Sequence, residues 1–104
     1  MPLRVRVCRV ADVVAGQARP FAVPGVTWPV LVTRLDGAIV AVPGVCPHED
    51  VALADGDLEG ATLVCPGHRW GFDLRTGRCP VAPDLELRRY RVSVLGEDVW
   101  VDLL

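Results

Sequence analysis

Both histidines of the chain and two of its four cysteines lie within one stretch, CPHEDVALADGDLEGATLVCPGH at residues 46–68. Cys46 is paired with His48, and Cys65 is paired with His68. Thiolates are soft ligands that favour zinc, copper(I) and iron–sulfur clusters, while neutral imidazole binds zinc, copper and iron. The residue types predict a metal centre and leave two candidates: a structural tetrahedral zinc site, or a two-iron cluster with mixed ligands.

The order of the ligands favours the cluster. Common zinc fingers pair Cys with Cys and His with His over short intervals, whereas each segment here contributes one of each. If one iron binds both cysteines and the other binds both histidines, each segment must place its Cys and its His on different metals. The short Cys-x-His and Cys-x-x-His spacings are compatible with that task. Because two thiolates leave such a cluster neutral, it accepts an electron more readily than an all-cysteine cluster does.

Short strands must position these ligands, because Gly and Pro punctuate the chain and no helical period is present. We expect an all-β fold of eight or nine strands, arranged as a small antiparallel barrel or sandwich. Apolar or alternating runs predict strands at residues 3–10, 19–23, 29–35, 38–42, 61–64, 70–74, 86–95 and 99–103. Each Cys/His pair follows an apolar strand, so two loops at the ends of hairpins can meet at one site.

The local details of these strands and turns are also predictable. In the first strand, Leu3, Val5 and Val7 or their neighbours are expected to face inward. The segment CPVAPD at residues 79–84 is too rich in proline for regular structure. Tight turns are expected at Asp36-Gly37, Glu59-Gly60 and Thr76-Gly77.

Length and composition predict one small folded domain, residues 1–104, with 51% hydrophobic and 23% charged residues. All eleven basic residues are arginine, but acidic residues outnumber them, which argues against a nucleic-acid partner. The sequence shows neither a signal peptide nor a membrane span, so we expect a cytoplasmic protein with no membrane association, working as a monomer. In a reducing cytoplasm, cysteines at motif spacing are better interpreted as metal ligands than as disulfides.

The pattern CPH, sixteen residues, CPGH resembles the signature of Rieske iron–sulfur proteins. The similarity extends into HRWGFDLRTGRCPVAP and covers at least residues 40–84. It implies one [2Fe–2S] cluster, with the two cysteines of the pairs on an inner iron and the two histidines on an outer iron near the surface. It also implies that the proline loop at residues 79–83 covers the third side of the cluster.

The subfamily is indicated by residues that differ. Respiratory Rieske proteins carry an extra cysteine in each ligand loop and a serine after the second histidine, whereas this chain has Val51, Gly67 and Arg69 at those positions. Fewer hydrogen bonds to the cluster predict a potential toward the lower end of the roughly −150 to +300 mV Rieske range. Acidic neighbours act in the same direction, namely Glu49, Asp50, Asp55 and Asp57.

The resemblance therefore points to ferredoxin components of bacterial ring-hydroxylating dioxygenases and related multicomponent monooxygenases. Such a protein is an electron-transfer component rather than an enzyme. It carries single electrons from an NAD(P)H-dependent flavin reductase to a terminal oxygenase, and transient docking is expected near His48, His68 and Trp70. The alternative is a Rieske-type small subunit of a larger oxidoreductase, similar to that of assimilatory nitrite reductases.

The remaining cysteines and tryptophans have simpler interpretations. Cys8 is expected to be a small buried hydrophobic residue in a strand. Cys79 is expected to pack near the cluster rather than bind it, because four ligands already complete the site. Trp28 and Trp100 are expected to be packing residues.

Overall fold

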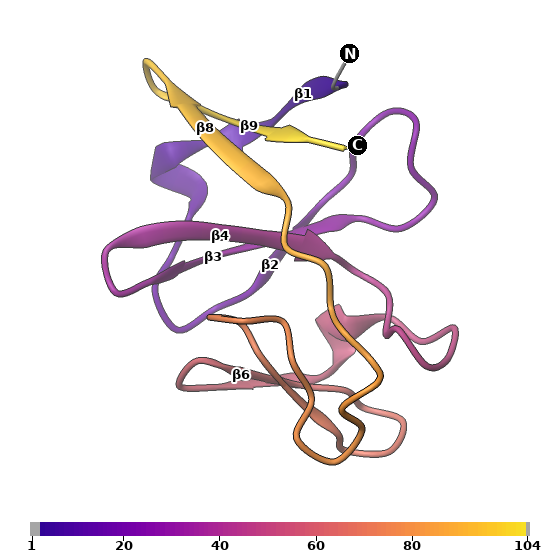
Figure 1. The fold of residues 1–104 in the computed structure, drawn as a ribbon. Helices are drawn as coiled ribbons and strands as arrows, with labels where there is room; N and C mark the ends of the chain where they lie inside the picture. The colour runs from indigo at the N-terminus through magenta and orange to yellow at the C-terminus, as the bar shows by residue number, and fades with distance from the viewer. Residues whose placement is uncertain (1–2, 104) are drawn as a thin grey trace.

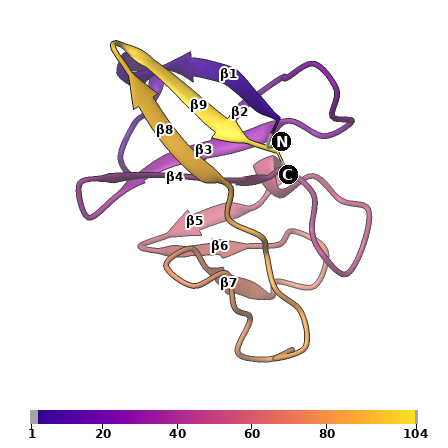
Figure 2. The ribbon, with the colours of Figure 1, turned by 45° about the horizontal axis from the view of Figure 1, so that its top comes forward.

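The computed structural model describes residues 3–103, so Met1, Pro2 and Leu104 of the expected domain lie outside the described residues. Nine short strands form three antiparallel sheets, with the orders β1-β9-β8, β2-β3-β4 and β5-β6-β7. Figures 1 and 2 show these three sheets stacked along the molecule. The strands are β1 Arg4–Arg9, β2 Arg19–Phe21, β3 Val30–Leu35, β4 Ala38–Pro43, β5 Asp57–Glu59, β6 Thr62–Val64, β7 Gly71–Asp73, β8 Arg91–Leu95 and β9 Asp98–Asp102.

The middle sheet, β2-β3-β4, is covered on both faces. Residues of β3 alternate between two hydrophobic cores, with Val30 and Val32 in the first and Leu31 in the second. A strand buried on both sides is apolar along its length rather than alternating, which explains the run VLV at the start of β3. The middle sheet therefore lies between two hydrophobic cores, and each of the other two sheets packs against one of its faces.

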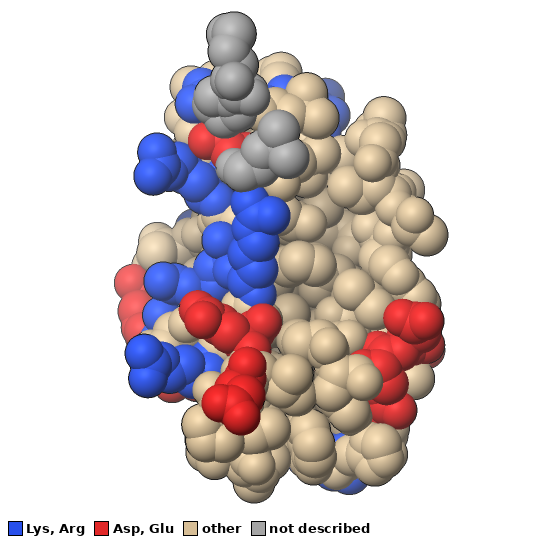
Figure 3. Space-filling model, turned by 45° about the vertical axis from the view of Figure 1, so that its right-hand side comes forward, with Lys and Arg blue, Asp and Glu red and all other residues tan. Residues whose placement is uncertain are grey.

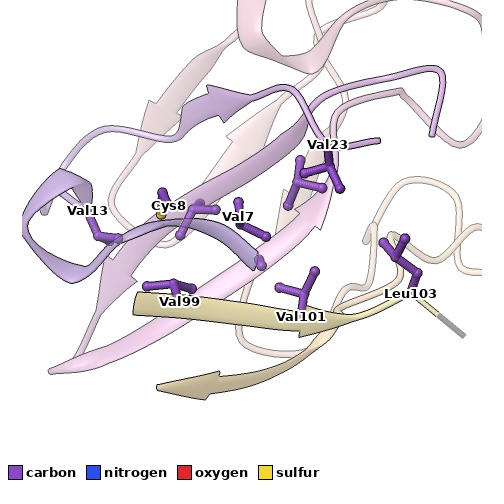
Figure 4. Close-up of a cluster of buried hydrophobic side chains, with 10 residues drawn as sticks. Val7, Cys8, Val13, Val23, Val99, Val101 and Leu103 are labelled. Carbon is purple, nitrogen blue, oxygen red and sulfur yellow. The ribbon is translucent and has the colours of Figure 1, made fainter. Parts of the chain in front are cut away.

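The first core lies between the middle sheet and the sheet β1-β9-β8. Figure 4 shows its side chains, with Val99 and Val101 of β9 pointing toward Val7 and Cys8 of β1. The predicted packing role of Cys8 is confirmed, because its side chain is only 4% exposed within this cluster. The second core lies beneath the other face of the middle sheet and contains Leu31, Val42, Cys46, Leu53, Leu63, Cys65, Phe72, Leu74, Cys79 and Leu87.

Of the three residues expected to face inward from the first strand, Val7 is buried and Val5 packs against the first core, but Leu3 does not follow them. Leu3 is 50% exposed, although strict alternation would place it on the inner face with Val7. The pairing of β1 with β9 shifts register between Arg6 and Cys8, so one extra residue is accommodated there. Such a bulge turns the consecutive residues Val7 and Cys8 toward the core together, which interrupts the period-two pattern.

The predicted hairpin turns are confirmed. Asp36 and Gly37 connect β3 to β4 with φ of 52° and 81°, the left-handed values that a tight two-residue hairpin turn requires. Gly60 and Gly77 also have positive φ, at 61° and 83°. Together these turns connect the short strands that lead into and out of the ligand loops.

Three features differ from the sequence-based expectations. Strand β5, Asp57–Glu59, is not among the expected strands, and strand β8 begins at Arg91 rather than at residue 86. Before β8, Glu86 forms only an isolated bridge with Arg78, and two backbone N–H groups bond outside the sheet: Leu87 donates to the Gly77 carbonyl and Tyr90 to the Ala41 carbonyl. Two 3-10 helices were also not expected, η1 Val10–Asp12 and η2 Leu53–Asp55.

The all-β antiparallel prediction is otherwise confirmed by the three sheets. Within residues 3–103, no helix has the length and hydropathy needed to cross a membrane.

Candidate metal centre

The first ligand loop leaves β4 and returns to the second core at Leu53. An isolated antiparallel bridge joins Val45 to Ala52, and the N–H of Cys46 donates to the carbonyl of Val51 over 3.1 Å. The residues between Cys46 and Val51 therefore form a closed loop. The bonds at the base of this loop fix the positions of Cys46 and His48.

The second ligand loop connects β6 to β7 and is closed in the same way. The N–H of Cys65 donates to the Trp70 carbonyl over 2.8 Å, and the N–H of Arg69 donates to the Cys65 carbonyl over 2.9 Å. Arg69 has φ of 61°, a left-handed conformation that costs a non-glycine residue about 1 kcal/mol. This turn brings the chain back to β7 within a few residues, with His68 at the tip.

The two loops bring all four predicted ligands together. Cys46 Sγ lies 2.7 Å from His48 Nδ1, and His48 Nε2 lies 2.7 Å from His68 Nδ1. The donor atoms of Cys46, His48 and Cys65 all lie within 4.8 Å of one another. Residues twenty positions apart in the chain thus share one site, as the split Cys/His spacing predicted.

Burial separates the two kinds of ligand. Cys46 and Cys65 are 3% and 0% exposed in the second core, whereas the side chains of His48 and His68 are 13% and 58% exposed. Soft thiols inside and imidazoles outside are the donor set that a mixed-ligand two-iron cluster needs. The residues present therefore fit a [2Fe–2S] cluster with an inner and an outer iron.

The environment of Cys46 favours the protonated thiol. Burial raises the pKa of Cys46 from 9.0 to about 11, and the nearby Cys65 adds to this, although the backbone N–H of His48 acts in the opposite direction. Metal binding requires the thiolate, so loading of the site must release this proton.

Glu49 also belongs to this site, although the sequence indicates it only as an acidic neighbour of the ligands. Its Oε1 atom lies 3.1 Å from His48 Nε2, 3.2 Å from His68 Nδ1 and 3.8 Å from Cys65 Sγ. A side chain at Gly67 would overlap with this carboxylate, so Gly67 leaves the room that Glu49 occupies. The only signal in the sequence is that Glu49 follows a ligand and Gly67 precedes one.

The two residues that follow His68 in the chain make different contacts. Trp70 stacks on His48 with ring centroids 4.4 Å apart, and lies 5.8 Å from His68. Arg69 forms ion pairs with Asp57 at 3.0 Å and Glu59 at 3.6 Å, both on β5. The missed strand β5 therefore supplies the anions that surround Arg69.

The proline loop lies against the same core. Cys79 is 1% exposed and belongs to the hydrophobic cluster that contains Cys46 and Cys65. Successive turns shape the loop, because the N–H of Ala82 donates to the Cys79 carbonyl and that of Leu85 to the Ala82 carbonyl. Trp28 and Trp100 are half-buried, and their packing role stays a prediction.

Comparison with known proteins identifies relatives of this arrangement. The chain is 37% identical to the ferredoxin component of the naphthalene 1,2-dioxygenase system of Pseudomonas aeruginosa, over 67% of this chain and 68% of that protein. It is 35% identical to the 3-phenylpropionate/cinnamic acid dioxygenase ferredoxin subunit of Shigella boydii, over 96% of this chain and 93% of that protein.

Solved structures share the fold. The ferredoxin in a complex of reduced oxygenase and oxidised ferredoxin in carbazole 1,9a-dioxygenase superimposes with a TM-score of 0.82 at 26% identity, over 98% of this chain and 94% of that one. A Mycobacterium tuberculosis protein described as a putative NADH-dependent nitrite reductase small subunit gives 0.81 at 20% identity, over 100% and 97%. At that identity the second match bears on the fold alone.

The sequence-based prediction of a Rieske ferredoxin, an electron-transfer component rather than an enzyme, is confirmed by these relatives, each of which is named as a ferredoxin component or subunit. The predicted cofactor is confirmed as well, because the family model that matches residues 4–91 describes a Rieske [2Fe-2S] domain. The chain belongs to the Rieske [2Fe-2S] domain family.

Proposed function

We propose that this chain carries single electrons from an NAD(P)H-dependent flavin reductase to a terminal oxygenase, one that hydroxylates aromatic rings. The observation that carries the proposal is the burial difference among the four ligands, with the thiols enclosed and His68 58% exposed. An electron carrier needs its redox centre fixed in the interior and reachable at one edge. The names of the relatives supply the dioxygenase context.

The ligands in this proposal are Cys46 and Cys65 for the inner iron, and His48 and His68 for the outer iron. When bound, the cluster supplies a reversible one-electron couple. The chain contributes the rest: two closed loops hold the donor atoms, and the second core excludes water from the thiol side. Residues 1–104 serve as one domain in this proposal.

Transfer takes place at the histidine edge. The exposed imidazole of His68 forms the point of contact with each partner, whereas His48 is less exposed and has the indole of Trp70 stacked on its ring. Trp70 is half-buried and amphipathic, which suits a small transient interface. The ferredoxin similar to this chain that was solved in a complex with an oxygenase supports an oxygenase as one of the partners.

The surface charge is divided. Figure 3 shows arginines gathered in a band on one face, with acidic residues in separate groups below and beside it. Around the histidines, Glu49, Asp57 and Glu59 are acidic and Arg69 is the neighbouring cation. This mixed rim favours a partner surface with matching charges of both signs, and makes association sensitive to salt.

We further propose a cytoplasmic monomer, because NAD(P)H-dependent reductases work in the cytoplasm, where cysteines at motif spacing stay reduced and bind metals. Reconstitution tests the function. Purified chain is added to a flavin reductase and a terminal oxygenase of the dioxygenase type, and NADH oxidation coupled to product formation is measured. Turnover should depend on the chain and saturate with it; turnover that is the same without the chain contradicts the proposal.

The second candidate is the alternative that the sequence left open, a small subunit of a larger oxidoreductase; the match to the nitrite reductase protein shows that the fold is compatible with it and no more. It predicts a stable complex with a large subunit. Size-exclusion chromatography of the chain from its native source separates the two, because a transient carrier elutes alone.

A further inference from the structure

A second set of metal-binding atoms overlaps the cluster site. His48 Nε2, His68 Nδ1 and Glu49 Oε1 form a triangle with sides of 2.7, 3.1 and 3.2 Å. This set differs from the thiol-containing set, because it includes the Glu49 carboxylate and excludes both cysteines. It also lies on the exposed side of the centre, where an ion can enter from solvent.

The triangle has the size that three ligand atoms of one metal ion would have. Ligand atoms at right angles around a metal, with bonds of about 2.05 Å, lie about 2.9 Å apart, whereas tetrahedral ligands lie about 3.3 Å apart. The observed sides of 2.7, 3.1 and 3.2 Å lie near these two values, so all three atoms can bind the same ion. Two imidazole nitrogens and one carboxylate oxygen on one face are the ligand set of non-haem iron(II) sites, and they suit other divalent first-row metals.

We propose that, before the cluster is assembled, this chain binds one divalent transition-metal ion such as Fe²⁺ or Co²⁺ through His48, Glu49 and His68. The ion and the cluster exclude each other, because both use the two histidines. The proposal is independent of the electron-carrier function, since it concerns the chain without its cluster.

Gly67 is part of this site. A methyl group there would overlap with Glu49 Oε1, which is the far end of a flexible side chain, so an alanine displaces the carboxylate rather than the backbone. The backbone of Gly67 is outside the left-handed region, so the alanine adds no strain. Gly67→Ala therefore removes the third ligand while Glu49 itself remains in the chain.

The test is a titration of the full-length, cluster-free chain with Co²⁺ under anaerobic conditions, followed by optical absorbance and calorimetry. One ion should bind per chain, with the weak d–d bands of nitrogen and oxygen ligation and without thiolate-to-cobalt charge transfer. Glu49→Gln should weaken binding by more than the roughly 10–100-fold that loss of an outer partner costs a metal site.

Gly67→Ala should weaken binding in the same direction, and Asp50→Asn, the exposed acidic neighbour, should leave it unchanged. Strong thiolate charge transfer with undiminished affinity in Glu49→Gln would show that the cysteines bind the ion and overturn the proposal. A cluster-free chain that binds no Co²⁺, whether folded or unfolded by circular dichroism, overturns it as well. Neither result would change the outcome expected when oxygenase turnover is reconstituted, so the electron-carrier function is tested separately.

Discussion

The indole of Trp70 lies stacked on the imidazole of His48, with ring centroids 4.4 Å apart and planes inclined by 25°. This contact accounts for the unequal exposure of the two histidines, 13% for the His48 side chain against 58% for His68. Trp70 is itself held by the bond from the Cys65 N–H to its carbonyl. The His48 side of the centre is thereby covered, and the His68 side is open to solvent.

Substitution of Trp70 tests whether its indole protects the cluster from solvent. Trp70→Ala removes an aromatic contact worth about 0.5–1.5 kcal/mol beyond its buried area, so the cluster should be lost faster to an iron chelator. Trp70→Phe keeps the stack and should retain most of the protection. The measurement is the decay of visible absorbance under chelator; equal decay in wild type and Trp70→Ala would contradict a covering role.

Charges beside the histidines should shift the reduction potential. Arg69→Gln removes a cation and should lower the potential, whereas Asp57→Asn removes an anion and should raise it. Both groups are exposed, so each shift should be on the order of tens of millivolts or less and should shrink with added salt. Protein-film voltammetry measures both; shifts of the same sign would refute the electrostatic explanation. Arg91→Gln, on β8 of the first sheet, is the control and should leave the potential unchanged.

Two glycines with similar backbone angles should differ in tolerance. Gly77 has φ of 83°, and an added Cβ would overlap with the carbonyl of Leu87, whose N–H donates to Gly77. Gly25 has φ of 90° with open space around it. Gly25→Ala should cost about 1 kcal/mol, or about 4–8 °C in melting temperature, and Gly77→Ala clearly more. Equal melting temperatures for the two variants would show that the turn at Gly77 relaxes freely.

Cys79→Ser should keep the cluster and lose stability. The side chain is 1% exposed in the second core, and a hydroxyl buried there without a partner costs about 1–3 kcal/mol. Iron content and the visible spectrum should match wild type while the melting temperature falls. Cys65→Ser is the matched control and should lose iron. Iron loss in Cys79→Ser would make Cys79 a ligand.

The cluster-free chain should be less stable in alkali. Because burial raises the pKa of Cys46 to about 11, the unfolded thiol loses its proton first as the pH rises from 9.0. The free energy of unfolding should therefore fall between about pH 9 and pH 11. Burial of Cys8 raises its pKa too and acts in the same direction. Urea denaturation at several pH values checks this, and Cys46→Ala should flatten the dependence; an unchanged slope would contradict the assignment.

The clustering of the four candidate ligands and most of the strands were predictable because their signals are local. The Asp36-Gly37 dipeptide specifies its turn by backbone conformation, and split Cys/His pairs after apolar strands specify a shared site. Strand β5 was not predictable, because one apolar residue between two acidic ones is too short an alternation to distinguish a strand from a loop.

Other features depend on contacts between distant parts of the chain. The β1 bulge arises from pairing with β9, and the chain before β8 is held instead by the bonds from the Leu87 N–H to Gly77 and from the Tyr90 N–H to Ala41. The contact of Glu49 with both histidines requires the second loop to fold over the first. None of these partners can be identified from neighbouring residues in the sequence.

Electron delivery is tested most directly by rapid mixing of the chemically reduced chain with an oxidised terminal oxygenase of the dioxygenase type. Absorbance should report cluster reoxidation with one electron gained by the oxygenase per chain, and the rate should fall as salt is added. A reduced chain that stays reduced beside a competent oxygenase, while a known ferredoxin partner of that oxygenase is oxidised in parallel, would contradict the account.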